Sequence, residues 1–184
     1  MDFQLVVMVA LFLTQLRKKP TQVCPCGYFN HPEKECTCAP VMVHKYLNKI
    51  SGPLLDRIDL HVEVTPVPFS ELSSTRQTEP SVNIRERVLK ARDIQAKRFE
   101  EQTGVYCNAQ MGSKLLKEIC VINQVGQNLL KTAMDRLNLS ARAYDRILKV
   151  SRTIADLANS EDIKAEHLAE AIQYRSLDRE GWAG

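Results

Sequence analysis

The sequence predicts a mainly α protein, and three observations lead to this fold class. Apolar residues recur with helical spacing over most of the chain after Val82. The breaks between these stretches carry residues that start or stop helices, such as Ser140 and the pair Asn159-Ser160. The 184 residues are also 44% hydrophobic and 26% charged, which is typical of a globular chain.

Residues 81–184 are predicted to form a domain of about five amphipathic helices. Isolated amphipathic helices of this length are marginal in water, so these helices must pack against one another. Ser140 is the expected N-cap of the strongest helix. The apolar residues that mark the helices run from Ile84 to Phe99, Leu115 to Ile119, Leu129 to Leu137, Tyr144 to Leu157 and Ile163 to Ile172.

Residues 1–65 are organised differently. Phe3 to Val9 is predicted to be a buried strand, residues 24–40 a loop rich in cysteine and proline, and Met42 to Ile50 a helix. After a turn at Ser51-Gly52-Pro53, the alternation of polar and apolar residues over 59–64 predicts a second strand. Residues 66–80 contain three prolines and several hydroxyl side chains, which is typical of a linker.

The apolar run from Leu5 to Leu13 is too short to span a bilayer, which needs about 20 apolar residues. Asp2 precedes the run and Arg17 to Lys19 follow it, which is the reverse of the charge order in a signal peptide. We therefore prefer a buried strand to a membrane anchor and expect a cytoplasmic protein without a membrane partner. The net charge of +3 neither requires nor excludes nucleic acid.

Four cysteines form a cluster with metal-ligand character. They come as two pairs, each with one residue between its members, namely Cys24 and Cys26, then Cys36 and Cys38. Thiolates are favoured ligands of structural Zn²⁺, which takes four of them in a tetrahedron. The pairs predict a zinc site, although the commoner spacing has two residues between the cysteines, and His31 or Glu33 could also take part. A reduced, metal-free loop or occasional disulfides are the alternatives.

Two stretches place an arginine where it can contact a phosphate. Arg57 lies between Asp56 and Asp59, and the simpler interpretation is a surface salt bridge, which contributes little. In the helix after Ser140, the basic residues fall on one side, opposite the apolar stripe. Arg142 stands in the first turn, where free backbone N–H groups also attract an anion. These basic residues are Arg142, Arg146, Lys149 and Arg152, and a solvated face with Asp145 and Asp156 as local partners is the alternative.

The sequence lacks the motifs of a self-sufficient enzyme. It contains no G-x-x-x-x-G-K-[ST] phosphate-binding loop (Walker A) and no apolar run that ends in paired acidic residues (Walker B). Its four histidines have no metal-binding spacing. We therefore expect no nucleotide hydrolysis by this chain alone.

Three stretches together resemble the carboxy-terminal part of the magnesium-chelatase-like AAA+ ATPases of the ComM/YifB type: Cys24 to Tyr28, Tyr46 to Leu60, and Leu139 to Val150. The resemblance extends from about Cys24 to Glu180. It implies that residues 1–65, with the Cys-rich loop 24–40, are the terminal fragment of an α/β AAA+ core. Residues 81–184 would then be the helical lid domain.

The resemblance also implies roles for single residues. Arg57 matches the arginine finger, which reaches the nucleotide of the neighbouring subunit, and Arg142 matches the sensor-2 arginine of the lid. Gln22 stands where the family has the sensor-1 Asn, and its amide is one methylene further from the backbone. ATP and Mg²⁺ would be bound largely by segments outside this chain. Identical subunits in a hexameric ring and DNA would be the partners.

Three hypotheses follow from the sequence. The first is the sensor and lid portion of a ring-forming ATPase that acts on DNA. The second is a zinc-stabilised adaptor without enzymatic activity, which binds nucleic acid through the basic stretches 85–98 and 142–152. The third is a decayed fragment, which the exposed edges of an incomplete sheet would make prone to aggregation.

Overall fold

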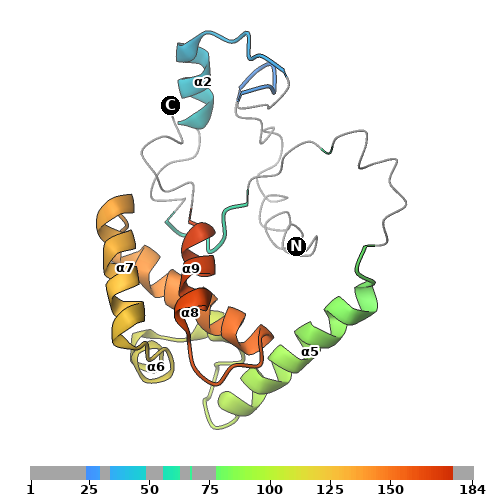
Figure 1. Ribbon diagram of the computed structural model, residues 1–184, viewed down its shortest axis with the longest axis vertical. Helices are drawn as coiled ribbons and strands as arrows, with labels where there is room; N and C mark the ends of the chain where they lie inside the picture. The colour runs from blue at the N-terminus through green and yellow to red at the C-terminus, as the bar shows by residue number, and fades with distance from the viewer. Residues whose placement is uncertain (1–23, 30–33, 49–55, 63–66, 68–77, 176–184) are drawn as a thin grey trace.

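The computed structural model describes residues 24–29, 34–48, 56–62, 67 and 78–175. In these residues six α-helices and one short 3₁₀ helix form, and no strand does, so the mainly α fold class is confirmed (Figure 1). The predicted strand Phe3 to Val9 lies outside the described residues. The helices are α2 (Pro40–Leu47), α5 (Ser81–Arg98), α6 (Ser113–Ile119), α7 (Gln124–Leu137), α8 (Ala141–Leu157) and α9 (Ala165–Gln173), with the 3₁₀ helix η1 at Asn108–Gln110.

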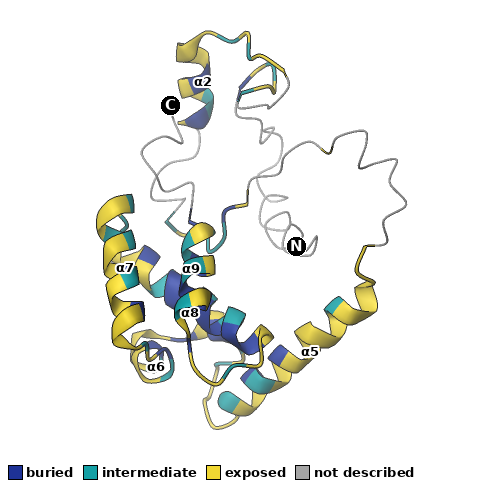
Figure 2. Cartoon of the chain, viewed as in Figure 1, coloured by how far each residue is buried: buried dark blue, intermediate teal, exposed yellow. Residues whose placement is uncertain are grey.

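Helix α8 is the centre of the helical domain. It packs against α5, η1, α6 and α9, and α7 packs against α9. Its inward face is buried and the outer helices are mostly exposed (Figure 2). The core consists of Phe99, Met111, Leu116, Cys120, Leu130, Ile147, Leu148, Ala155, Ile163, Leu168 and Ala171. Aliphatic side chains dominate this core, as the low aromatic content of 6% requires.

Local capping sets the ends of α7 and α8. The Ser140 hydroxyl accepts a hydrogen bond of 3.2 Å from the backbone N–H of Ala143, so Ser140 is the predicted N-cap. The Asn123 side chain caps α7 in the same way through Gly126, at 2.9 Å. Asn138 ends α7 with a φ of 48°, a left-handed conformation that Asn tolerates better than most residues.

Helices α7 and α9 approach each other closely near their N-terminal ends. Ile122 and Ile163, which precede the two helices, form an isolated parallel bridge. A Cβ atom at Gly126 would lie 2.7 Å from a methyl group of Leu168, which is fully buried. The absence of a side chain at Gly126 therefore allows this contact between the helices.

The strand predicted over 59–64 is not present in its described part. Residues 56–62 form a turn and an irregular segment that runs along the ends of α8 and α9. The backbone N–H of His61 donates to the carbonyl oxygen of Tyr174, directly after α9, at 2.7 Å. Within 56–62 only His61 is buried, whereas Arg57 and Val62 are exposed. The alternation of polar and apolar residues therefore does not correspond to a buried strand face, and the His61 backbone bonds to the end of α9 instead of to a neighbouring strand.

Candidate functional site

The segment that carries Arg57 is attached to the helical domain on both sides of that residue. Asp59 forms an ion pair with Arg146 of α8. Arg175 follows α9 and is fully buried; it donates to the carbonyl oxygen of Ile58, and its guanidinium lies 3.9 Å from a carboxylate oxygen of Asp56. The two aspartates that flank Arg57 in the sequence are therefore engaged by other arginines.

Arg57 itself is exposed. Within the described segments it forms no ion pair, so the salt bridge to Asp56 or Asp59 that the sequence allowed is not formed. The guanidinium is thus presented at the surface by a segment whose neighbouring side chains are held. An exposed cation on a fixed backbone can meet an anion that belongs to another molecule.

Arg142 occupies the first turn of α8 and is also exposed. The first turn of α8 contains no acidic residue, so no side chain within it offsets the positive end of the helix dipole. Ser140 already caps one of the free backbone N–H groups. The position combines a guanidinium with the remaining N–H groups, an arrangement that favours a phosphate.

The other basic residues of α8 are not available for a phosphate. Arg146 pairs with Asp59, and the Lys149 ammonium donates to the carbonyl oxygen of Ala109 at 3.0 Å. Arg152 is only 3% exposed, so its predicted place on a basic phosphate-binding face is wrong. Its guanidinium instead bonds to Asp156 and to the carbonyl oxygens of Ser160 and Glu161, which join α8 to α9.

Arg152 belongs to a buried polar network centred on Asp156. The Asp156 carboxylate accepts two hydrogen bonds from Arg98 at 2.7 and 2.6 Å, one from Arg152 at 3.1 Å and one from Asn108 at 2.7 Å. Gln95 accepts from the backbone N–H of Asn108 at 3.1 Å. The network joins α5, η1 and α8, and of its contacts only the local pair of Arg152 and Asp156 was predicted from the sequence.

The four predicted metal ligands lie together. The sulfur atoms of Cys24, Cys26, Cys36 and Cys38 are all within 4.8 Å of one another. Cys24 lies 3.3 Å from Cys26 and 3.8 Å from Cys36, and Cys26 lies 3.5 Å from Cys36. A tetrahedron of sulfurs about 2.3 Å from a central zinc ion has edges of about 3.8 Å. The residues therefore fit a four-thiolate zinc site, and the sulfurs are too far apart for disulfides, which need about 2.0 Å.

The thiols of this cluster affect one another. The backbone N–H of Tyr28 is the main reason that the pKa of Cys26 is lowered to about 6. At Cys36 the backbone N–H of Cys38 lowers the pKa, but burial and the neighbouring sulfur atoms outweigh it and raise the pKa to about 12. The lowered pKa of Cys26 and the raised pKa of Cys36 mean that the first thiol ionises more readily than the second. A divalent cation bound by the four sulfurs would favour the thiolate form of each.

The cluster also organises the start of the described chain. Cys24 is fully buried together with Val43 and Leu47 of α2. A metal bound by the four sulfurs would hold the loop against α2, because one ligand is part of this small apolar cluster. Figure 1 shows α2 and the loop at the opposite end of the molecule from α5 and α6.

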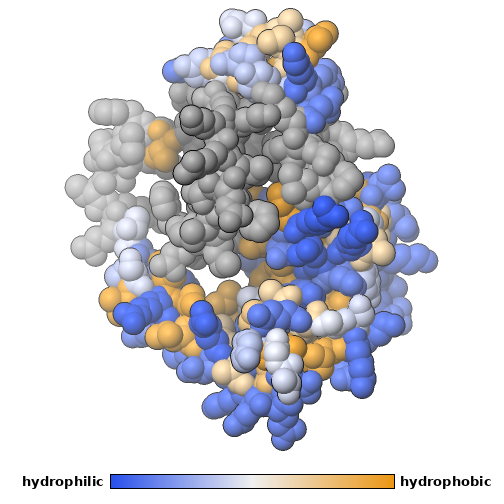
Figure 3. Space-filling model, turned by 180° about the vertical axis from the view of Figure 1, so that it is seen from behind, coloured by the Kyte–Doolittle hydropathy of each residue, from blue (hydrophilic) through white to orange (hydrophobic). Residues whose placement is uncertain are grey.

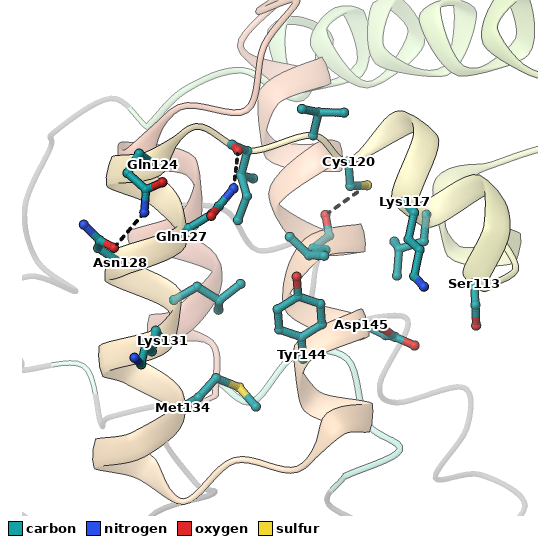
Figure 4. Close-up of a pocket in the computed structure, with 15 residues that line it drawn as sticks. Ser113, Lys117, Cys120, Gln124, Gln127, Asn128, Lys131, Met134, Tyr144 and Asp145 are labelled. Atoms are coloured by element: carbon teal, nitrogen blue, oxygen red, sulfur yellow. Dashed lines mark hydrogen bonds between the residues drawn. The ribbon is translucent and has the colours of Figure 1, made fainter.

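A groove between α6, α7 and α8 has a volume of about 680 Å³. Figure 4 shows Lys131 and Met134 of α7 on one side of it, Tyr144 of α8 in the middle and Lys117 of α6 on the other side. None of the residues predicted as site residues lines it. Gln22 lies outside the described residues.

Most of α5 is exposed. Only Ala91 and Gln95 of this helix are buried. Its N-terminal half carries exposed Val82, Val88 and Leu89 among charged residues.

From behind, the helical part of the surface is hydrophilic with hydrophobic areas between the charged side chains (Figure 3). No helix in the described part of the chain is both long and apolar enough to cross a membrane.

Comparison with known proteins gives two family matches. The carboxy-terminal region of magnesium chelatase subunit ChlI matches residues 78–175, and magnesium chelatase subunit ChlI matches residues 18–72. Arg57 and the four clustered cysteines fall within the second matched range, and Arg142 falls within the first.

Curated relatives match most of the chain. The Competence protein ComM of Haemophilus influenzae is 42% identical over 156 residues, and the uncharacterised protein YifB of Escherichia coli is 38% identical over 156 residues. The uncharacterised protein Rv2897c of Mycobacterium tuberculosis is 34% identical over 152 residues. These alignments cover 84%, 84% and 83% of this chain but only 29% of each relative.

Proposed function

The chain belongs to the magnesium chelatase ChlI family, in the part that it shares with the ComM and YifB proteins, and from this premise we propose that it is the sensor and lid portion of a ring-forming ATPase that acts on DNA. In this role it contributes arginines to ATP hydrolysis, while ATP and Mg²⁺ are bound largely by other parts of the assembly. The name of the ComM relative supports a link to competence.

The exposed Arg57 guanidinium is the observation that carries this proposal. Its flanking aspartates are held by Arg146 and Arg175, so the side chain is left to reach a nucleotide on the neighbouring subunit. Phosphoryl transfer spreads negative charge over the γ-phosphate oxygens, and an arginine finger accelerates it by about 10³ to 10⁵. Arg142 would contact the same kind of anion from the start of α8.

The test uses a chimera in which residues 24–184 replace the matching part of the Haemophilus influenzae ComM protein. We expect Arg57→Ala to lower kcat for ATP hydrolysis at least about 10³-fold while the Kd for ATP stays nearly unchanged. Arg57→Lys should restore little, because lysine lacks the planar fork of the guanidinium. The isolated 184-residue chain should show no turnover at all.

The matched control is Arg136→Ala, which removes another exposed arginine, at the end of α7, from the same chimera. It should leave kcat unchanged. If Arg57→Ala turns over ATP at the rate of the unmodified chimera, or if the isolated chain hydrolyses ATP, the proposed role is wrong.

We further propose that the cysteine cluster binds one structural zinc ion. The purified chain should contain about one zinc per molecule by elemental analysis, because four thiolates complete a tetrahedral site. Cys24→Ser and Cys36→Ser should each lose the metal, whereas Cys107→Ser, which changes a cysteine outside the cluster, should keep it. A metal-free chain that stays metal-free after reconstitution with zinc would contradict this assignment.

The second candidate function is an adaptor that binds nucleic acid without catalysis. The exposed basic residues of α5 favour it, since they outnumber the acidic residues Glu86 and Asp93 on the same helix; they are Arg85, Arg87, Lys90, Arg92 and Lys97. The adaptor predicts DNA binding by the isolated chain that weakens steeply as salt rises. Such binding together with an inactive chimera would favour the adaptor over the ATPase.

A further inference from the structure

The segment 56–62 is anchored at three points, one in α8 and two directly after α9. Asp59 is bound by Arg146 of α8, the Ile58 carbonyl by Arg175, and the His61 backbone N–H by the carbonyl oxygen of Tyr174. The first two of these contacts lie within two residues of Arg57. The position of the Arg57 backbone is therefore determined by α8 and by the end of α9.

The contact with α8 has a particular location. Arg146 lies four residues after Arg142, so its attachment to the helix is about one turn, or 6 Å along the axis, from that of Arg142. The ion pair of Asp59 with Arg146 thus connects the segment that carries Arg57 to the turn of α8 next to the one that carries Arg142. A shift of α8 would move both guanidinium groups together.

This ion pair is poorly placed to contribute much to folding. The side chain of Arg146 is 32% exposed and that of Asp59 is 46% exposed. Exposed ion pairs add little to stability, because water screens the attraction. Burial elsewhere, including the core around α8, keeps the domain folded without it. A contact of this kind can still restrict where a surface segment lies.

We propose that Asp59 and Arg146 are positioning residues for ATP hydrolysis, whose ion pair fixes Arg57 relative to Arg142 so that both arginines are presented as one unit. This inference rests on the proposed function. The physical reason is geometric, since a displacement of about 1 Å of a catalytic group can slow a reaction about 10²-fold. Neither positioning residue needs to touch the nucleotide.

The test compares kcat and KM for ATP in the ComM chimera. Asp59→Asn and Arg146→Gln keep the size of each side chain but remove the charge attraction. We expect each to lower kcat about tenfold to a hundredfold with KM nearly unchanged, because the loss concerns positioning and not ATP binding. The charge reversals Asp59→Arg and Arg146→Asp should each lower kcat when made alone. The double variant that carries both should recover part of kcat relative to either one, because it restores an ion pair with the charges exchanged.

Lys164→Gln is the matched control, because it breaks an exposed ion pair away from this contact, that of Lys164 with Glu166 at the start of α9, whose charged atoms lie 3.8 Å apart. It should change neither kcat nor KM. Amide hydrogen exchange on the 184-residue chain gives a second reading: Asp59→Asn should speed exchange over 56–62, including the His61 amide, while the core of α8 keeps its protection.

The outcomes separate the two proposals. If Arg57→Ala lowers kcat but Asp59→Asn and Arg146→Gln do not, the positioning inference is overturned and the proposed function stands. If Arg57→Ala has no effect, the proposed function fails whatever the other variants do. A loss of kcat in both single variants without any recovery in the exchanged pair, or an unchanged exchange rate over 56–62, also counts against the positioning role.

Discussion

Replacing Asp156 by Ala should severely destabilise the helical domain. The carboxylate has no exposed surface and accepts four hydrogen bonds, two from Arg98, one from Arg152 and one from Asn108. Without it two guanidinium groups remain in place, with side chains only 19% and 4% exposed. Removing one partner of a buried ion pair costs about 3–5 kcal/mol, since the remaining charge stays desolvated.

The magnitude is large compared with the free energy of unfolding of a small domain, which is about 5–15 kcal/mol. Urea unfolding followed by circular dichroism would measure it, with Arg87→Ala as the control for an exposed pair, expected to change the free energy by at most about 1 kcal/mol. Asp156→Asn keeps the shape and should destabilise less than Asp156→Ala. If Asp156→Ala costs less than about 1 kcal/mol, the reasoning about a desolvated network is wrong.

Two further predictions concern packing and reactivity. Gly126→Ala should destabilise the chain by about 1–2 kcal/mol, because its Cβ would meet the buried side chain of Leu168. Gly112→Ala is the control and should not destabilise the chain, because the space around Gly112 is open. Equal unfolding midpoints of the two variants would refute the close approach of α7 and α9. Burial raises the pKa of the Cys120 thiol to about 11, so at pH 8 it stays protonated. Iodoacetamide should therefore modify the more exposed Cys107 in the folded chain and Cys120 only after unfolding, as peptide mass spectrometry would show; equal rates would contradict this.

The helices were predictable because their signals are local. Ser140 precedes an apolar stripe at helical spacing, and its hydroxyl meets an N–H only three residues later. Asn138 and Asn159 follow the stripes of α7 and α8 and adopt the left-handed conformation that ends helices. Such contacts depend on residues that are close in the sequence, so the pattern alone is enough to place them.

The partners of the basic residues were not predictable to the same degree. Arg152 stands beside Lys149 on the helical wheel, so the sequence predicts that it faces solvent. In the structure Arg98 of α5, which precedes Asp156 by 58 residues, bonds to Asp156, as Arg152 also does. The packing of α5 therefore buries the side of α8 that carries Arg152. The same holds for Asp59, whose partner Arg146 is 87 residues away. Only the packing of α5 and of the segment 56–62 on α8 reveals which charges are engaged and which remain at the surface.

The most direct test of the central claim mixes two inactive forms of the ComM chimera. One carries Arg57→Ala, and the other keeps Arg57 but has its ATP-binding segment, in the ComM-derived part, inactivated. If Arg57 acts on the nucleotide of the neighbouring subunit, mixed rings contain complete sites at about a quarter of their interfaces, and ATP hydrolysis returns. If native mass spectrometry finds mixed rings but hydrolysis does not return, Arg57 does not serve a neighbouring site.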